Sequence, residues 1–277
     1  MPERSGPIAV FDSGVGGLSV LRAIQPLLPY EAVVYFADQA HVPYGSRPIE
    51  QIRRFSESIT RFLLGENCKI IVVACNTASA AALTSLRQTF PEVAFVGMEP
   101  AIKPAAEETR SGTVGVLATP ATFQGALYAS VVERFAQGVT LLQSAPAGLV
   151  EQIESGQLMA SVTRGILAEA LAPMLAAGID TLVLGCTHYP FVIPLIEQIA
   201  GPGVRVIDPS PAVARQVRRV LEAADLLATQ PGTPPRYLTS GSVERFKQNL
   251  LTLLGRQAPV EAMQWEAEIL HRVPLPA

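Results

Sequence analysis

The chain has 277 residues, of which 49% are hydrophobic and 16% are charged, and its formal net charge at pH 7 is −3. A chain of this length and composition can bury one large core or two smaller ones, and its charge offers no basic surface for nucleic acid or for an anionic membrane. Its 3 cysteines form no C-x-x-C pattern, so we predict neither a disulfide framework nor a zinc cluster.

The first apolar run, IAVF from Ile8, follows the polar segment MPERSGP. This run is too short for the apolar region of a signal peptide or for a membrane span. We therefore expect a protein of the reducing cytoplasm that has neither a membrane nor a nucleic acid as partner.

Short runs rich in Val, Ile and Leu alternate along the chain with segments of helical spacing. We expect strands at IAVF from Ile8, VVYFA from Val33, IIVVAC from Ile70, VAFVG from Val93, VGVLA from Val114, TLLQ from Thr140, TLVLGC from Thr181 and VRVI from Val204. Nearly continuous apolar strands are typical of a sheet that is covered on both faces. The alternation of strand and helix predicts an α/β fold with mostly parallel sheets built from βαβ units.

The two halves of the chain repeat weakly. KIIVVACNT, which ends at Thr77, resembles DTLVLGCTH, which ends at His188, and IAVFDSG from Ile8 resembles VGVLATP from Val114. The repeat predicts two similar domains, each a mostly parallel sheet flanked by helices. Because ligands bind beyond the carboxyl ends of the strands in such sheets, we expect the active site in the cleft between the domains.

We place the first domain at residues 1–97 plus 208–277 and the second at residues 98–207. The Pro-rich stretch 208–211 is the expected late crossing between them, and TQPGTPP from Thr229 is the expected linker that follows. The strand-like segment RYLTSG from Arg236 and the helix-like segment VERFKQNLLTLLG from Val243 are expected to return to the first domain.

Cys75 and Cys186 end equivalent strands of the two repeats. Inverting a carbon centre without a redox cofactor needs a base on one face and an acid on the other, and a thiol suits both tasks because its reference pKa is about 8.5. A free cysteine taken alone is usually a small buried hydrophobe, and we interpret Cys68, which lies outside the repeat, in that way. The matched pair instead predicts an opposed acid and base.

Four segments of the chain resemble, in order, the signature blocks of glutamate racemases. They are FDSGVGGLSVL from Phe11, PYGSR from Pro43, ACNTASA from Ala74 and LGCTHYP from Leu184, and the segments GMEPAIKPA and TSGSVERF extend the resemblance over most of the chain. The resemblance implies a cofactor-independent racemase of glutamate in which Cys75 takes the proton from the D enantiomer and Cys186 takes it from the L enantiomer. It also implies that D-glutamate supplies peptidoglycan assembly and that the protein is a homodimer.

Other polar residues stand beside these blocks. Asp12, in a Gly-rich loop, fits an Asx turn, but the resemblance favours a carboxylate that holds the substrate ammonium or influences the proton of Cys75. The resemblance also implies that His188 assists Cys186 and that Glu154 orients His188. The residues expected to bind substrate are Asp12, Ser13, Pro43, Tyr44, Gly45, Asn76, Thr77, Thr119, Thr122, Thr187 and His188.

Several alternatives remain at this point. Glu151 stands close enough to Glu154 to be the helper acid instead, residues 43–45 fit a simple turn, and an aspartate racemase fits the same thiols. A decarboxylase of the same superfamily needs one thiol only, an amino-acid sensor would leave both idle, and a cysteine hydrolase would need an oxyanion hole and a triad order that the sequence lacks.

The sequence also lacks the usual cofactor signatures. GVGGLS from Gly14 misses the third glycine of the dinucleotide fingerprint, and no P-loop is present. None of the lysines, Lys69, Lys103 and Lys247, stands in a setting typical of pyridoxal phosphate. We therefore predict no cofactor and no metal.

Overall fold

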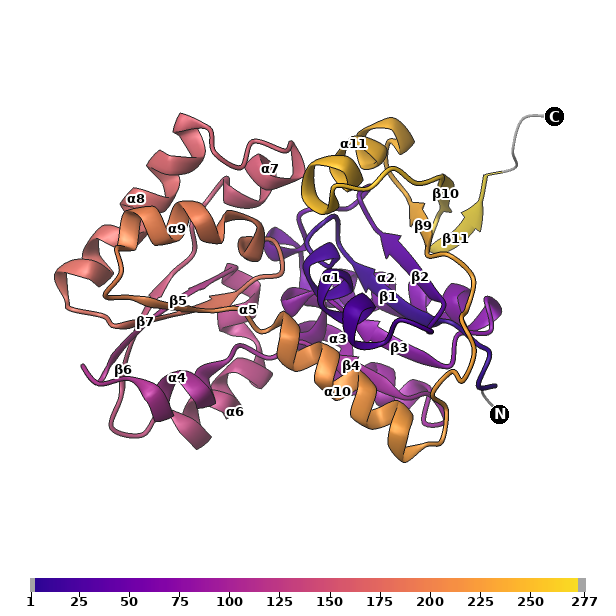
Figure 1. Cartoon of the computed structure of the whole chain (residues 1–277), viewed down its shortest axis with the longest axis horizontal. Helices are drawn as coiled ribbons and strands as arrows, with labels where there is room; N and C mark the ends of the chain where they lie inside the picture. Colours follow the sequence, from indigo (N-terminus) through magenta and orange to yellow (C-terminus); the bar gives the residue numbers. More distant parts are fainter. Residues whose placement is uncertain (1–2, 274–277) are drawn as a thin grey trace.

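The computed structural model describes residues 3–273, which form two α/β halves lying side by side (Figure 1). The strands are β1 (Ile8–Asp12), β2 (Val33–Ala37), β3 (Ile70–Val73), β4 (Phe95–Gly97), β5 (Thr113–Ala118), β6 (Thr140–Ser144), β7 (Thr181–Gly185), β8 (Arg205–Ile207), β9 (Arg236–Thr239), β10 (Val260–Glu266) and β11 (Ile269–Arg272). One sheet has the order β11-β10-β9-β2-β1-β3-β4 and the other the order β6-β5-β7-β8. The predicted α/β class with mostly parallel sheets is confirmed.

Helices cover the faces of both sheets (Figure 1). They are α1 (Leu18–Leu27), α2 (Ile49–Gly65), α3 (Asn76–Thr89), α4 (Ile102–Glu108), α5 (Pro120–Gln124), α6 (Ala126–Phe135), α7 (Leu149–Glu154), α8 (Ser161–Ala176), α9 (Ile193–Ala200), α10 (Ser210–Ala223) and α11 (Val243–Leu254), with short 3-10 turns at Tyr44–Ser46 and Tyr189–Val192.

The two sheets share one strand order, which is the structural form of the sequence repeat. The run β2-β1-β3-β4 in the larger sheet corresponds to β6-β5-β7-β8 in the smaller one, and all of these pairs are parallel. β1 therefore corresponds to β5, and β3 corresponds to β7. Because β3 and β7 deliver the two matched cysteines, the repeat places those cysteines at equivalent sheet edges.

Three further strands extend only the larger sheet. β9 pairs in parallel with β2, β10 pairs in parallel with β9, and β11 folds back antiparallel on β10. The hairpin of β10 and β11 was not predicted, because only Met263 and Leu270 among its residues are buried and the apolar signal is correspondingly weak.

The chain passes from the larger sheet to the smaller one after β4 and returns between β8 and α10, which packs against α1 (Figure 1). Residues 1–2 and 274–277 of the predicted first domain lie outside the described part of the chain.

Helix α2 shows how the apolar pattern directs packing. Ile52, Phe55, Ile59 and Leu63 recur at helical spacing and are buried against the larger sheet, each burial contributing about 1.5–3 kcal/mol. Ile49, at the start of the same stripe, is 39% exposed, because the first turn of the helix extends past the core.

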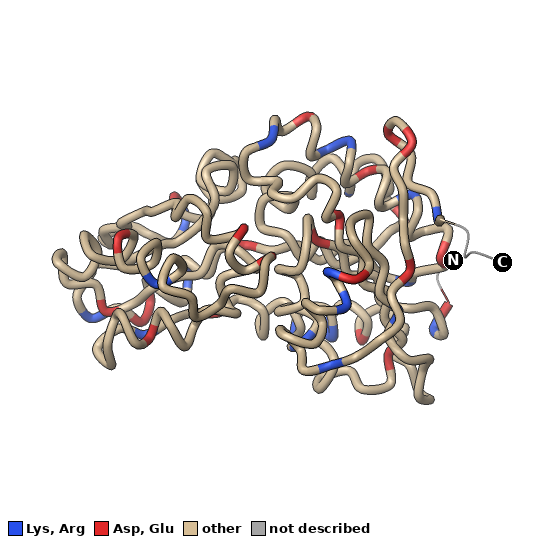
Figure 2. The backbone as a smooth tube through the Cα atoms, turned by 90° about the horizontal axis from the view of Figure 1, so that it is seen from above, with Lys and Arg blue, Asp and Glu red and all other residues tan. Residues whose placement is uncertain are grey.

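Acidic and basic residues are intermixed over both halves (Figure 2). Within residues 3–273, no helix combines the length and the apolar character that a bilayer crossing requires.

Candidate active site

Two buried cysteines line one small cavity, each from a different sheet. Cys75 caps the N-terminus of α3, and its Sγ accepts a hydrogen bond from Ala78 N at 3.4 Å. Cys186 directly follows β7, and both cysteines are 5% exposed. The cavity is lined by Ser13, Pro43, Tyr44, Gly45, Cys75, Asn76, Thr77, Thr119, Val150, Cys186, Thr187 and His188. The two thiols thus meet beyond the carboxyl ends of parallel strands, where open α/β sheets bind their ligands.

The surroundings of Cys75 favour a neutral thiol. Burial raises the pKa of Cys75 far above its usual range, and the nearby charge of Asp12 raises it further. The only polar side chain in hydrogen-bond contact with the thiol is Ser13, whose Oγ lies 3.9 Å from Sγ, among the residues that the structure describes. Asp12 is itself fully buried, and this burial raises its pKa although Gly14 N and Thr187 Oγ1 donate hydrogen bonds to its carboxylate.

His188 lies between Cys186 and Glu154 and contacts both side chains. His188 Nδ1 lies 3.7 Å from Cys186 Sγ, and His188 Nε2 lies 2.7 Å from Glu154 Oε1. Burial opposes a charge on His188, but its hydrogen bonds to Cys186 and Glu154 raise its pKa well above the usual value. Burial likewise opposes a charge on Glu154, yet the hydrogen bond from His188 leaves its pKa lowered. The raised pKa favours the imidazolium form of His188, in which both ring nitrogens can donate, one to the carboxylate and one to the sulfur.

The repeat is broken at this point. Cys75, Asn76 and Thr77 correspond to Cys186, Thr187 and His188, so the position two residues after the cysteine is a threonine in the first half and a histidine in the second. The two thiols therefore follow equivalent strands but differ in their neighbours, since Cys75 caps α3 whereas Cys186 contacts His188.

Contacts between the two halves surround the Glu154 carboxylate. Val15 N donates to Glu154 Oε1 at 2.7 Å, and Gln39 Nε2 donates to Glu154 Oε2 at 3.0 Å. A Cβ on Gly14 would overlap this carboxylate, and a Cβ on Gly16 would lie 2.5 Å from His188 Nδ1. The loop after β1 thus needs glycine so that the second half can approach closely.

The loop at residues 43–45 forms one wall of the cavity. Tyr44 begins a short 3-10 turn, and its hydroxyl donates to Asp38 Oδ2 at 2.6 Å. Thr77 Oγ1 and Thr119 Oγ1 are 2.9 Å apart and join the two halves near this wall.

Most of the residues predicted from the sequence lie on the cavity wall, but three do not. Asp12, Thr122 and Glu154 are absent from its lining and lie directly behind it. Thr187 Oγ1 donates to Asp12 Oδ2 at 2.9 Å, Thr122 Oγ1 is 2.9 Å from Thr119 Oγ1, and Glu154 contacts His188. Each of the three therefore touches a residue that does line the cavity.

Asn76 has hydrogen-bonding capacity that the protein does not use. It is 3% exposed, and neither its amide nitrogen nor its amide oxygen has a partner among the described residues. A buried polar group without a partner costs about 1–3 kcal/mol. Because Asn76 lines the cavity, its free amide indicates a polar ligand there.

The cavity is closed around the thiols. Its volume is about 10 Å³, roughly that of a single water centre, so this conformation has no room for an amino acid between the thiols. Two larger cavities, of about 660 and 470 Å³, contain neither Cys75 nor Cys186, so cavity size does not identify the site here.

Sequence reasoning missed Gln39 and Val150. Gln39 follows β2, and the rule that ligands bind at carboxyl strand ends would have drawn attention to it. Val150 presents only an apolar side chain, for which the sequence offers no signal.

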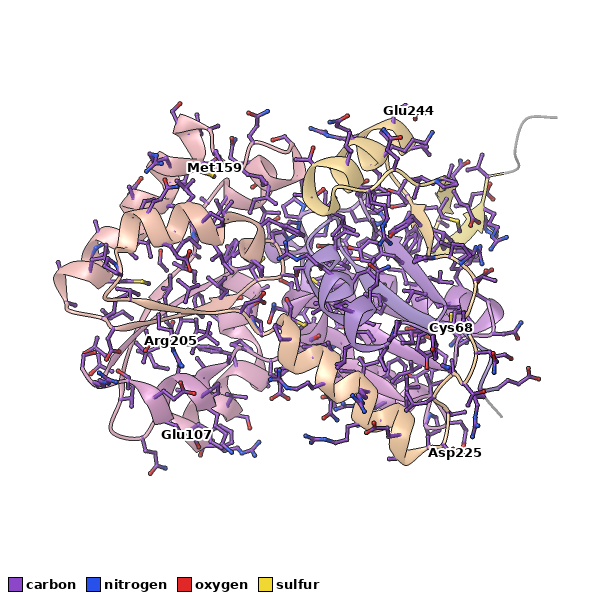
Figure 3. All side chains as sticks on the ribbon, in the orientation of Figure 1. Cys68, Glu107, Met159, Arg205, Asp225 and Glu244 are labelled. Carbon is purple, nitrogen blue, oxygen red and sulfur yellow. The ribbon has the colours of Figure 1, made fainter. Side chains whose placement is uncertain are left out.

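Cys68 lies in the first half, away from the second half of the molecule (Figure 3). Burial raises its pKa to about 12, which makes it unreactive near neutral pH. Within residues 3–273, no three His, Cys, Asp or Glu side chains are grouped as a metal site would require.

Residues 16–217 match the family model described as Asp/Glu/Hydantoin racemase. A glutamate racemase from Ectopseudomonas mendocina (strain ymp) is 51% identical over 260 residues, which cover 94% of this chain and 99% of that protein. The crystal structure of Escherichia coli glutamate racemase in complex with L-glutamate and the activator UDP-MurNAc-Ala is similar with a TM-score of 0.81 at 33% identity, covering 92% of this chain and 97% of that chain. The crystal structure of glutamate racemase from Francisella tularensis subsp. tularensis SCHU S4 in complex with D-glutamate gives a TM-score of 0.82 at 29% identity, with coverages of 94% and 97%.

Proposed function

The chain belongs to the glutamate racemases of the Asp/Glu/hydantoin racemase family, and we propose that it interconverts L- and D-glutamate with Cys75 and Cys186 as its two bases. The family that the sequence motifs predicted is thereby confirmed, and the enzyme is an isomerase. The observation that supports the mechanism is the pair of buried thiols that line one cavity from two repeated sheets.

Each thiol serves one face of the α-carbon in the proposed reaction. The Cys186 thiolate, beside the His188 imidazolium, removes the α-proton of L-glutamate, so that a C–H bond breaks and an S–H bond forms. The neutral thiol of Cys75 gives its proton to the opposite face and yields D-glutamate. Reaction from D-glutamate runs through the same two groups in reverse. The charges around the two sulfurs support this division, because Cys186 contacts His188, whose pKa is raised, whereas Cys75 lies near the carboxylate of Asp12.

The groups around the thiols suit the polar ends of an amino acid. The free amide of Asn76 and the hydroxyls of Ser13, Thr77 and Thr187 are available to bind the substrate carboxylate. The N-terminus of α3 adds backbone donors, which favour an anion. The Asp12 carboxylate behind the wall would attract the substrate ammonium, and a cation there would ease the loss of the proton from Cys75.

Glutamate rather than aspartate follows from the relatives. The Escherichia coli and Francisella tularensis structures hold L-glutamate and D-glutamate respectively. Racemisation of aspartate is the second candidate, since both substrates carry the same reacting atoms. We further propose that the D-glutamate feeds peptidoglycan assembly in the cytoplasm and that the enzyme acts as a homodimer without a cofactor.

A circular-dichroism assay tests this function. Purified protein is incubated separately with L-glutamate, D-glutamate, L-aspartate and D-aspartate, without pyridoxal phosphate, and the loss of optical rotation is followed. We expect both glutamate enantiomers to reach the racemate and both aspartates to remain optically active. Racemisation of aspartate at a comparable rate would contradict the glutamate assignment, and no reaction with any of the four would contradict the enzyme itself.

A further inference from the structure

The side chain of Gln39 connects the two halves of the molecule at the Cys186 side of the site. We propose that Gln39 is a positioning residue that completes the Glu154–His188–Cys186 relay when the cleft closes. This inference rests on the proposed two-thiol reaction. It predicts that Gln39 acts on proton removal from L-glutamate and not on proton removal from D-glutamate.

Gln39 belongs to the first half and Glu154 to the second. Gln39 follows β2, whereas Glu154 ends α7, and the two side chains meet through one hydrogen bond of 3.0 Å from Nε2 to Oε2. The other carboxylate oxygen, Oε1, receives bonds from His188 Nε2 and Val15 N. Each carboxylate oxygen is therefore held by a donor from the first half, and Oε1 also carries the relay.

The amide of Gln39 is fixed in orientation by a third strand. Thr239, at the end of β9, donates its hydroxyl hydrogen to Gln39 Oε1 at 2.9 Å, and its own oxygen accepts from Gly241 N at 3.1 Å. Because the Glu154 carboxylate only accepts hydrogen bonds, the amide nitrogen of Gln39 faces it and the amide oxygen faces the Thr239 hydroxyl. β9 extends only the larger sheet, so this support has no counterpart in the smaller one.

Opening of the cleft would remove both first-half donors from Glu154, since Gln39 and Val15 move together with the larger sheet. His188 would then face a carboxylate that is free to turn. Closure restores the two donors, fixes the carboxylate and presents the imidazolium to Cys186. Cys75 lies outside this chain of contacts, because its polar neighbours are Ser13 and Asp12.

The test uses variants that retain one thiol, so that each half-reaction is read separately. In the Cys75→Ser background, wash-out of the α-proton of L-glutamate into deuterated water reports only on Cys186. In the Cys186→Ser background, wash-out from D-glutamate reports only on Cys75. We expect Gln39→Met to slow the first exchange roughly tenfold, the effect of losing one hydrogen bond to a charged group, and to change the second less than twofold.

Interchanging the two side chains separates a positioning role of Gln39 from simple packing. In the double variant Gln39→Glu with Glu154→Gln, the amide and carboxylate change places, so the bond between the halves is retained while His188 loses its carboxylate partner. We expect the double variant to recover the KM for L-glutamate that Gln39→Glu alone raises, while kcat stays low. Gln51→Met is the matched control, since Gln51 is a partly buried residue of the same half whose side-chain oxygen accepts from Arg47.

The outcomes distinguish this inference from the mechanism on which it rests. Failure of both single-thiol variants to exchange either enantiomer, or wild-type racemisation by either of them, would overturn the two-thiol reaction. If both single-thiol variants exchange selectively, but Gln39→Met affects the two exchanges equally or affects neither, the role of Gln39 is overturned and the two-thiol reaction stands. A loss from Gln51→Met as large as that from Gln39→Met would also overturn it.

Discussion

Replacing Glu154 with glutamine should weaken the Cys186 half of the reaction selectively. The side chain keeps its size and can still accept from Val15 N, but the imidazolium of His188 loses its ionic partner at 2.7 Å. A hydrogen bond between charged groups contributes about 1.5–3 kcal/mol, and about 1.4 kcal/mol corresponds to a factor of ten. We therefore expect proton removal from L-glutamate to slow roughly 10- to 150-fold.

The assay must measure exchange and not net turnover. The enantiomers have equal free energy in water, so kcat/KM for net racemisation changes equally in both directions, whichever thiol is impaired. Wash-out of the α-proton into deuterated water, followed by NMR from each enantiomer before the other accumulates, separates the two faces. Glu151→Gln is the matched control, because Glu151 lies on the same helix, α7, and is exposed. Equal slowing from both enantiomers in a folded Glu154 variant would refute the reasoning, as would an equal loss from Glu151→Gln.

Four other outcomes are expected. Cys75→Ser and Cys186→Ser should each abolish net racemisation, since a hydroxyl is too weak an acid to form the base near neutral pH. Cys75→Ser should still exchange the α-proton of L-glutamate, and Cys186→Ser that of D-glutamate. Near wild-type racemisation by either variant would contradict this. Activity should survive exhaustive dialysis against a chelator and removal of pyridoxal phosphate; loss that is restored by adding metal or pyridoxal phosphate would exclude the cofactor-independent reaction. Gly14→Ala should reduce racemisation at least tenfold and lower the free energy of unfolding by about 1–3 kcal/mol in urea titrations, because the added Cβ would overlap the Glu154 carboxylate. Unchanged racemisation and unchanged stability would show that the two halves need not approach so closely. Because the pKa of His188 is raised, its contribution to stability is complete below about pH 6.5 and decreases as pH rises toward the pKa of the folded state, whereas the contribution of Glu154, whose pKa is lowered, is complete above about pH 4.5 and decreases as pH falls below it. The difference in urea midpoint between wild type and His188→Asn should therefore be largest between these two pH values. A difference that does not change with pH would contradict the ion pair.

The α/β class followed from the sequence because buried parallel strands are apolar throughout. IIVV at β3 and TLVLG at β7 are fully buried, and such runs stand out against the amphipathic helices between them. The hairpin of β10 and β11 could not be recognised in this way, because it packs through single residues such as Met263.

The thiols were predicted from the repeat, and the structure brings both to one cavity. Their catalytic roles, and those of the other site residues, remain predictions. Gln39 was missed because its hydrogen-bond partner Glu154 lies 115 residues away in the sequence, and no local pattern encodes that pairing. The small size of the cavity could likewise not be predicted from the sequence, since it depends on how the two sheets meet.

In the proposed two-thiol reaction, the unequal neighbours of the two cysteines imply that the free enzyme left by one direction of the reaction differs in proton position from the form left by the other. A molecule that has just converted L-glutamate carries its extra proton on Cys186, whereas the charge distribution around the sulfurs favours that proton on Cys75. The proposed mechanism therefore requires two isomeric forms of the free enzyme, each competent for one enantiomer, and a proton must return between turnovers. If this recovery step were slower than the chemistry on the substrate, it would limit the rate at high substrate concentration. Its sensitivity to solvent isotope and to buffer would then reveal a slow event that takes place while the site holds no substrate.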